Sequence, residues 1–250
     1  MKIQVLPAAY EDVEAMRELY RQELNCQIIH DSFLSRGLAD PYLIHVNGRI
    51  EGYGAISNKY DKGRLIGFYT FPDVRNLSRF IFRELLIATQ ATHIEAQTNA
   101  PLMLLMLHDY ATNITAEKVL FHDTFVTHLV CANGIFRRSV PKDAASIFPH
   151  QHEPVGDWVI EASGQVVATG GFLSHYNPPY GDIYMEVAEA FRRMGFGSYL
   201  IQELKRVCYE AGKEPAARCN PGNLASRRAL EKAGLLPCGH LLVGEVKPLG

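Results

Sequence analysis

The sequence has little of what marks a membrane or nucleic-acid-binding protein. Its longest apolar run, residues 101–107, is far shorter than the roughly 18 residues that a membrane-spanning helix needs. The 250 residues carry 25 Lys and Arg against 27 Asp and Glu, and basic residues gather only in short pairs such as Arg137-Arg138. A nucleic-acid binder would normally present a basic face. We therefore expect no membrane and no nucleic acid as partner.

Cysteine is also scarce. The five cysteines are odd in number and lack tight spacing, which argues against a disulfide framework and favours a reducing compartment. Because the N-terminus has no apolar signal-peptide core either, we predict a cytoplasmic protein. The segment His150-x-His152-Glu153 has metal-ligating residue types, but a closed site needs further placed ligands, so we predict no metal.

The spacing of apolar residues predicts a mixed α/β (α+β) chain. Residues 11–24 have helical periodicity, and Asn47-Gly48 is a hairpin signal because both turn positions need positive φ. Further strands are predicted at 64–71, 92–99 and 117–131, with helices at 78–88 and 101–111.

The second half repeats this order of elements. A hairpin turns at Ser163-Gly164, a strand covers 182–191, and helices cover 197–211 and 223–233, the latter with Asn223 as N-cap. Strands are also predicted at 157–162, 165–173, 214–220 and 239–246. A repeat near half the length predicts two domains, residues 1–133 and 134–250.

One segment carries a chemical signal: Arg192-x-x-Gly195-x-Gly197, between a predicted strand and a predicted helix. The first turn of a helix has unpaired N–H groups and the positive end of the helix dipole, which together favour an anion. The glycines let the backbone approach phosphate oxygens, and arginine supplies charge-assisted donors. Neither a P-loop nor a Gly-x-Gly-x-x-Gly dinucleotide fingerprint is present. A glycine turn without ligand is the alternative.

These residues resemble motif A of the GNAT superfamily of N-acetyltransferases. Asn223 opening a helix that ends at Gly234-Leu235 resembles the second signature of that family. The match covers residues 158–235, whereas the first half resembles the family in element order only and has no Gly-x-Gly at the corresponding turn. The resemblance implies two GNAT-like mixed β-sheets flanked by helices, with a degenerate N-terminal domain and an acetyl-CoA-binding C-terminal domain.

The resemblance also implies the site. The fourth and fifth strands are expected to splay and admit the pantetheine arm of acetyl-CoA, which acts as co-substrate. A small-molecule amine would attack the thioester directly, and the protein would be a monomer or homodimer. The expected cofactor-binding residues are Val187, Arg192, Arg193, Met194, Gly195, Phe196, Gly197, Ser198, Asn223 and Ser226.

Catalytic candidates lie on the strand that enters the motif. Glu186 is the candidate base, with Tyr184 on the same side of the strand. Family members commonly have a Tyr as acid for the thiolate where this chain has Leu230, so either Tyr180 or Tyr184 serves or the thiolate leaves unprotonated. The same difference leaves open a second reading, a coenzyme A sensor or interaction module without turnover.

Overall fold

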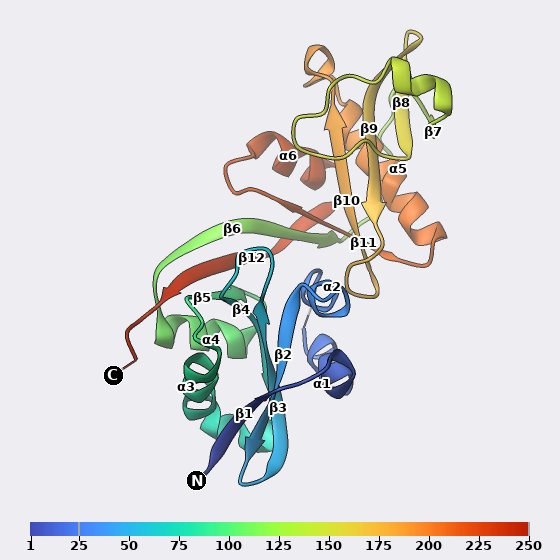
Figure 1. Ribbon diagram of the computed structural model, residues 1–250. Coiled ribbons are helices and arrows are strands. Elements are labelled where there is room, and N and C mark those ends of the chain that lie inside the picture. Colours follow the sequence, from blue (N-terminus) through green and yellow to red (C-terminus); the bar gives the residue numbers. More distant parts are fainter. Residues whose placement is uncertain (25, 250) are drawn as a thin grey trace. The chain divides into compact units, whose positions relative to one another are not determined.

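The computed structural model describes residues 1–24 and 26–249 and divides the chain into two compact units (Figure 1). The first unit contains Met1–Lys118 together with the residues from Gly239 onward, and the second contains Val119–Cys238. Strand β6 (Ala111–Asp123) therefore begins in the first unit and ends in the second, and β12 (Leu235–Val246) does the reverse. The predicted boundary between residues 133 and 134 stays a prediction, and Gly250 lies outside the described residues.

The first unit is a mixed sheet between two pairs of helices. Its strands follow the order β1-β2-β3-β4-β5-β12, and only β4 and β5 run parallel. The strands are β1 (Ile3–Pro7), β2 (Ala39–Val46), β3 (Arg49–Ser57), β4 (Arg64–Thr70) and β5 (His93–Gln97). The helices are α1 (Tyr10–Gln22), α2 (His30–Ser35), α3 (Ser78–Thr89) and α4 (Pro101–Tyr110), with a 3-10 turn η1 (Pro72–Leu77).

Each face of this sheet has its own core. Ile81 and Phe82 of α3 and Met103 of α4 pack with Phe68 and Ile94 on one face. Val13 and Tyr20 of α1 pack with Tyr53 and Tyr69 on the other. The alternation of side chains along the strands produces these two apolar faces.

The second unit repeats the plan with fewer helices. Its strand order is β6-β11-β10-β9-β8-β7, and only β10 and β11 run parallel. The elements are β7 (Ile135–Arg138), β8 (Trp158–Ala162), β9 (Gln165–Leu173), β10 (Tyr180–Val187), α5 (Phe196–Glu210), β11 (Glu214–Cys219) and α6 (Leu224–Lys232). Two 3-10 turns are η2 (Pro141–Ala145) and η3 (Glu189–Phe191).

Helix α5 covers one face of the second sheet. Leu200, Ile201 and Leu204 are fully buried against strand residues such as Ile160 and Ile183. The long segment between β7 and β8 passes the other face (Figure 1), where three of its backbone N–H groups donate to the side chain of Glu186. The face of β10 opposite α5 is therefore polar and is covered by a loop.

The predicted fold class of mixed sheets flanked by helices is confirmed. Both hairpin turns have positive φ at their central residues, 51° and 84° at Asn47-Gly48 and 50° and 75° at Ser163-Gly164. The predicted strand 117–131 is wrong at its end, because β6 stops at Asp123, and the strand 182–191 is wrong beyond Val187, where η3 begins. The sequence reading also missed β1, α2 and β7.

Candidate functional site

The glycine motif forms an exposed bend between β10 and α5. Arg193 and Gly195 both have left-handed backbone conformations, with φ of 64° and 90°. Arg192, Arg193 and Met194 are exposed, and Met194 is 62% exposed. Gly195 is the residue before the helix, and a left-handed φ is a conformation that glycine adopts without the penalty of a Cβ. The bend is therefore open to a ligand.

Six consecutive backbone N–H groups are available at this bend. Those of Arg193 to Ser198 donate to no acceptor in the part of the chain that the structure describes, and no side chain caps the helix. The first intrahelical bond at this end runs from the N–H of Tyr199 to the carbonyl oxygen of Gly195, at 3.1 Å. Free N–H groups at the positive end of a 15-residue helix attract an anion.

Strands β10 and β11 separate just before the bend. Within the described residues they pair over four positions, from Tyr180 opposite Glu214 to Ile183 opposite Ala217. Residues 184–187 of β10 remain paired with β9 on their other side. Apart from the carbonyl oxygen of Val187, which accepts a hydrogen bond from Arg192 Nε, the backbone groups of 184–187 that face β11 pair with no described residue of β11 and are open to an extended ligand segment.

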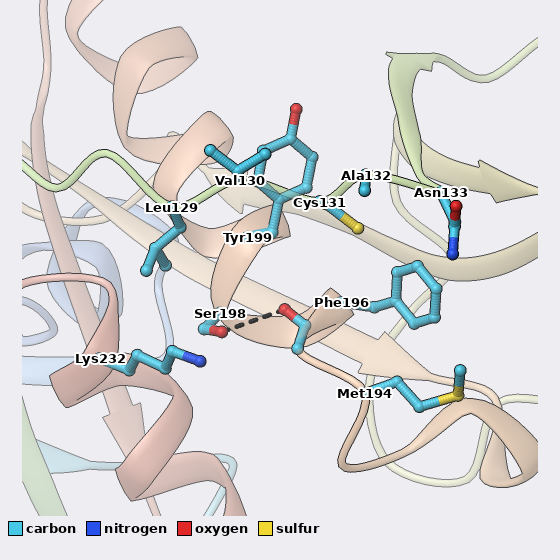
Figure 2. A pocket seen from close by; sticks show the side chains of 11 residues that line it. Leu129, Val130, Cys131, Ala132, Asn133, Met194, Phe196, Ser198, Tyr199 and Lys232 are labelled. Carbon is cyan, nitrogen blue, oxygen red and sulfur yellow. Dashed lines mark hydrogen bonds between the residues drawn. The ribbon is translucent and has the colours of Figure 1, made fainter.

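A cavity of about 200 Å³ adjoins the bend (Figure 2). Four predicted cofactor residues line it: Met194, Gly195, Phe196 and Ser198. Its other lining residues are Leu129, Val130, Cys131, Ala132, Asn133, Tyr199 and Lys232. The sequence reading missed these seven, because residues 129–131 were assigned to a strand and Lys232 lies 34 positions after Ser198.

The other predicted cofactor residues do not line the cavity. The Nε atom of Arg192 donates to the carbonyl oxygen of Val187 at 3.2 Å. The Oδ1 atom of Asn223 accepts the N–H of Ser226 at 3.1 Å, which confirms Asn223 as the N-cap of α6. Gly197 is closely packed, since a Cβ there would lie 3.2 Å from Met185 Cε and 3.4 Å from Val187 Cγ2.

Glu186 is buried and its carboxylate is heavily hydrogen-bonded. Its oxygens accept the backbone N–H groups of Gln151, His152 and Glu153 at 3.0, 3.2 and 3.1 Å. Desolvation of the buried carboxylate opposes ionisation, but these three N–H donors outweigh it and lower the pKa of Glu186. A lowered pKa makes Glu186 a weaker proton acceptor and a stable negative charge beside the strand opening.

Tyr184 lies on the same side of β10 as Glu186. Its ring packs over Gly171, where an added Cβ would lie 2.8 Å from the phenol oxygen. Burial, with smaller effects of Asp157 and Glu153, raises the pKa of Tyr184, so the phenol stays protonated at neutral pH. A protonated phenol is suited to donate a proton. Leu230, at the position where the family resemblance led us to expect a Tyr, is buried in the core of the second unit.

A charged pair continues the polar face of β10. Arg218 of β11 donates to Asp182 Oδ2 through Nε at 3.0 Å and Nη2 at 2.6 Å, and Nη2 also donates to Tyr176 at 3.2 Å. The guanidinium carbon lies 5.0 Å from the Tyr176 ring centre. The sequence did not predict this pair, because Arg218 follows Asp182 by 36 residues.

In the segment His150-x-His152-Glu153, the ring of His150 contacts a backbone carbonyl and a hydroxyl group of the protein. The Nδ1 atom of His150 lies 2.8 Å from the carbonyl oxygen of Glu153, and Nε2 lies 3.0 Å from Thr169 Oγ1. In residues 1–24 and 26–249, no three His, Cys, Asp or Glu side chains gather as metal ligands would. Within the same ranges, no helix has the length and apolar character needed to cross a membrane.

Comparison with known families supports the motif reading. Residues 125–235 match the acetyltransferase (GNAT) family model, and residues 9–124 match a model described as an acetyltransferase (GNAT) domain. The two models together cover residues 9–235, both halves of the chain. The protein therefore belongs to the GNAT acetyltransferases and is a tandem acyltransferase of that type. No curated protein sequence matches the chain significantly.

Solved structures share this tandem fold. A GNAT-family acetyltransferase from Colwellia psychrerythraea is 16% identical with a TM-score of 0.76, over 99% of this chain and 100% of that one. A GCN5-related N-acetyltransferase from Sphaerobacter thermophilus is 15% identical with a TM-score of 0.61, over 98% and 96%. A tandem GNAT protein of the clavulanic acid pathway is 12% identical with a TM-score of 0.59, over the full length of both chains. At these identities the similarity concerns the fold.

Proposed function

We propose that the second unit binds acetyl-CoA and transfers its acetyl group to a primary amine of a small molecule. The observation that carries the proposal is the run of free N–H groups from Arg193 to Ser198. They can hold the diphosphate of the cofactor, with Arg192 and Arg193 adding positive charge. Membership of the GNAT acetyltransferases supports the reaction class.

The pantetheine arm would extend along the open side of β10. The backbone of Val187 would bind the amide groups of this arm, and an N–H at the strand opening would stabilise the oxyanion of the tetrahedral intermediate. Asn223 and Ser226, at the start of α6, would border the arm. The amine nitrogen attacks the carbonyl carbon of the thioester, and the carbon–sulfur bond breaks to release coenzyme A.

Two residues divide the proton transfers in this proposal. Glu186 attracts the ammonium form of the acceptor and accepts its proton through water, and its low pKa limits its strength as a base. Tyr184 would donate a proton to the leaving thiolate, and its raised pKa keeps the phenol protonated but limits its strength as an acid. The protein would work in the cytoplasm, a setting that the odd number of widely spaced cysteines supports, as a monomer or homodimer.

Calorimetry with coenzyme A and acetyl-CoA, followed by an amine panel with detection of free thiol, tests the proposal. We expect binding, and thiol release with at least one small amine. Gly197→Val is expected to abolish binding, because its branches would meet Met185 and Val187. Absence of heat with coenzyme A at millimolar concentration would contradict the cofactor assignment.

Leu230 favours one alternative, a coenzyme A sensor or interaction module without turnover, since no hydroxyl is present at that position. Tight binding of coenzyme A without thiol release for any amine would support this alternative. An unchanged acetylation rate in Glu186→Gln would contradict the role of Glu186 as base but not the proposed acetyl transfer.

A further inference from the structure

The gap between β10 and β11 has a closed end, and two side chains flank that end on the polar face of the sheet. Within the described residues, Ile183 and Ala217 are the last paired residues of the two strands. Tyr184 follows on β10 and Arg218 follows on β11. Because Ile183 packs in the core that α5 covers, Tyr184 points to the opposite face. Arg218 reaches that face too, since it donates to Asp182, two residues before Tyr184.

Arg218 is held in one orientation and still has donors to spare. Its Nε and Nη2 atoms donate to Asp182 at 3.0 and 2.6 Å, and Nη2 also donates to Tyr176 at 3.2 Å. In residues 1–24 and 26–249, Nη1 donates to no acceptor, and the side chain is 22% exposed. A guanidinium has five N–H donors in a planar fork and stays charged at neutral pH. The free edge of Arg218 can therefore bind an anionic group.

Negative charge lies on the other side of Tyr184, across β9. Tyr184 pairs with Gly171 of β9. The preceding residue, Gly170, pairs with Trp158 of β8, and Asp157 directly precedes this tryptophan. Because Trp158 packs against the core under α5, Asp157 points to the polar face. Neighbouring strands lie about 4.8 Å apart, so the row from β8 to β11 spans about 14 Å, a width that suits a small molecule.

The polar face thus has an acidic side and a basic side around the phenol. Asp157 is exposed, and its charge adds to the effect of burial in raising the pKa of Tyr184. Glu186, two residues after Tyr184, adds a second carboxylate to the acidic side. Arg218 lies alone on the basic side, at β11. A ligand with one ammonium group and one carboxylate group is complementary to this distribution of charge.

We propose that the acceptor is an amino acid and that Arg218 binds its carboxylate through Nη1. The inference rests on the proposed function and names the class of amine. The cofactor arm enters from the bend, at the open end of the gap, so its thioester lies at the closed end beside Tyr184. The amino group of the acceptor meets the thioester there, between Arg218 and the carboxylates of Asp157 and Glu186.

The reaction at this position is balanced. The acceptor nitrogen forms the amide bond with the acetyl carbon, and the carbon–sulfur bond of the thioester breaks. The ammonium form of the acceptor loses two protons, of which one reaches the thiolate and the other passes to solvent. The carboxylate of the acceptor takes no part in bond making and only fixes the molecule at Arg218.

A carboxylate suits Arg218 better than a phosphate does. Asp182 already places one negative charge against the guanidinium. A second anion is therefore repelled by Asp182, and the repulsion is smaller for a singly charged carboxylate than for a doubly charged phosphate.

Acetylation of matched acceptor pairs by the full chain tests the inference. Each pair is an amino acid and its decarboxylated amine, such as lysine with cadaverine or phenylalanine with phenethylamine, and release of free thiol from acetyl-CoA is measured. We expect kcat/KM to be about ten- to hundredfold higher for at least one amino acid than for its decarboxylated amine, as for a hydrogen bond to a charged group. The methyl ester of that amino acid, which lacks the negative charge, should react like the decarboxylated amine.

Arg218→Gln should lower kcat/KM about ten- to hundredfold for the amino acid, mainly through KM, and much less for the decarboxylated amine. This variant leaves the buried carboxylate of Asp182 without its cation, which destabilises a fold. The double variant Asp182→Asn with Arg218→Gln removes both charges and should lose the preference in the same way. Arg218→Lys keeps the charge without the fork and should retain part of the preference.

The matched control is Arg206→Gln. Arg206 also pairs with two carboxylates, Glu203 and Glu210, but lies on α5, which covers the other face of the sheet. It should retain the wild-type preference, and thermal melts of all variants verify folding.

Two results would overturn the inference and leave the proposed acetyl transfer intact. One is an equal kcat/KM for both members of every pair in the wild type. The other is a loss in both Arg218→Gln and the double variant that is equally large for the amino acid and for its decarboxylated amine, as a merely structural role would produce. Thiol release with none of the amines would overturn both the inference and the proposed function.

Discussion

The imidazole Nδ1 of His150 lies 3.6 Å from Oε2 of Glu186, and both side chains are less than a tenth exposed. The three residues after His150 donate their N–H groups to the same carboxylate. Glu186 therefore holds the loop between β7 and β8 on the polar face of β10. Its position in the proposed chemistry depends on this anchoring as much as on its charge.

Replacement of this carboxylate should destabilise the protein in a pH-dependent way. At pH 7, Glu186→Gln should lower the free energy of unfolding by about 2 kcal/mol, since hydrogen bonds to a buried charged group contribute roughly 1.5–3 kcal/mol. Because the pKa of Glu186 is lower in the folded chain, the carboxylate stabilises the fold above its unfolded pKa. That contribution is lost as the pH falls through the folded value.

Urea unfolding of wild type and Glu186→Gln from pH 7 to pH 3 measures this difference. The gap should narrow as the pH falls below the ordinary range of a glutamate. Glu189→Gln, an exposed carboxylate two residues beyond β10, serves as control and should show little change. A gap that stays constant with pH would contradict the anchoring role.

Replacement of glycine by alanine should have different effects on coenzyme A binding at Gly195 and at Gly222. Gly195→Ala places a Cβ in open space but on a backbone with φ of 90°, where an L-residue costs about 1–2 kcal/mol. We expect the bend to relax away from this conformation and the affinity for coenzyme A to fall about five- to thirtyfold. Gly222→Ala also places its Cβ in open space, without positive φ, and should bind as the wild type does. Equal affinities of all three proteins would contradict the assignment of the bend as the diphosphate site.

The parts of the fold that sequence predicted depend on local chemistry. Asn47-Gly48 forms its hairpin and Asn223 caps α6, because turns and caps involve neighbours within four residues. The predicted strand 117–131 extends beyond Asp123, where β6 ends, because the end of this strand depends on a contact with a distant part of the sequence. The N–H groups of Thr124 and Phe125 donate to the carbonyl oxygen of Gly234, more than a hundred residues away.

The candidate site likewise combines features that follow from local sequence with features that depend on distant residues. The exposed bend at Gly195 follows from a short motif, whereas the amide donors to Glu186 lie more than thirty residues before it in sequence. The sequence did not identify Lys232 as a residue that lines the cavity. A lysine in the last turn of a helix is also expected because it interacts favourably with the helix dipole. Cavity lining of this kind emerges only from tertiary packing.

Coenzyme A should protect one cysteine from alkylation. Cys131 lines the cavity and is partly exposed, whereas Cys26, Cys208 and Cys219 are buried. At ten times its dissociation constant, coenzyme A fills about nine tenths of the sites, so labelling of Cys131 by a maleimide should slow about tenfold. Mass spectrometry of digested protein follows each thiol.

Cys238 provides the internal control for this experiment. It is partly exposed but does not line the cavity, so its labelling rate should be independent of coenzyme A. In Cys131→Ser the protected signal should disappear. Equal labelling of Cys131 with and without saturating coenzyme A would show that the cofactor does not occupy this cavity.

Gln97 offers a stability test in the first unit. Its side chain is 1% exposed, and neither its amide nitrogen nor its oxygen has a hydrogen-bond partner in residues 1–24 and 26–249. A buried polar group without a partner costs roughly 1–3 kcal/mol. Gln97→Met removes the polar atoms and keeps an unbranched side chain. We expect a gain of about 1–2 kcal/mol and a rise in melting temperature of about 2–4 °C or more.

Gln27→Met is the matched control because its amide is satisfied. Its Oε1 accepts Arg17 Nη2 at 3.1 Å, and its Nε2 lies 3.1 Å from His30 Nδ1. Loss of these bonds leaves a buried guanidinium with one acceptor fewer, so Gln27→Met should lower the melting temperature. If Gln97→Met is instead as destabilising as Gln27→Met, the amide of Gln97 has a bound partner such as an ordered water, and the fold of the first unit depends on it.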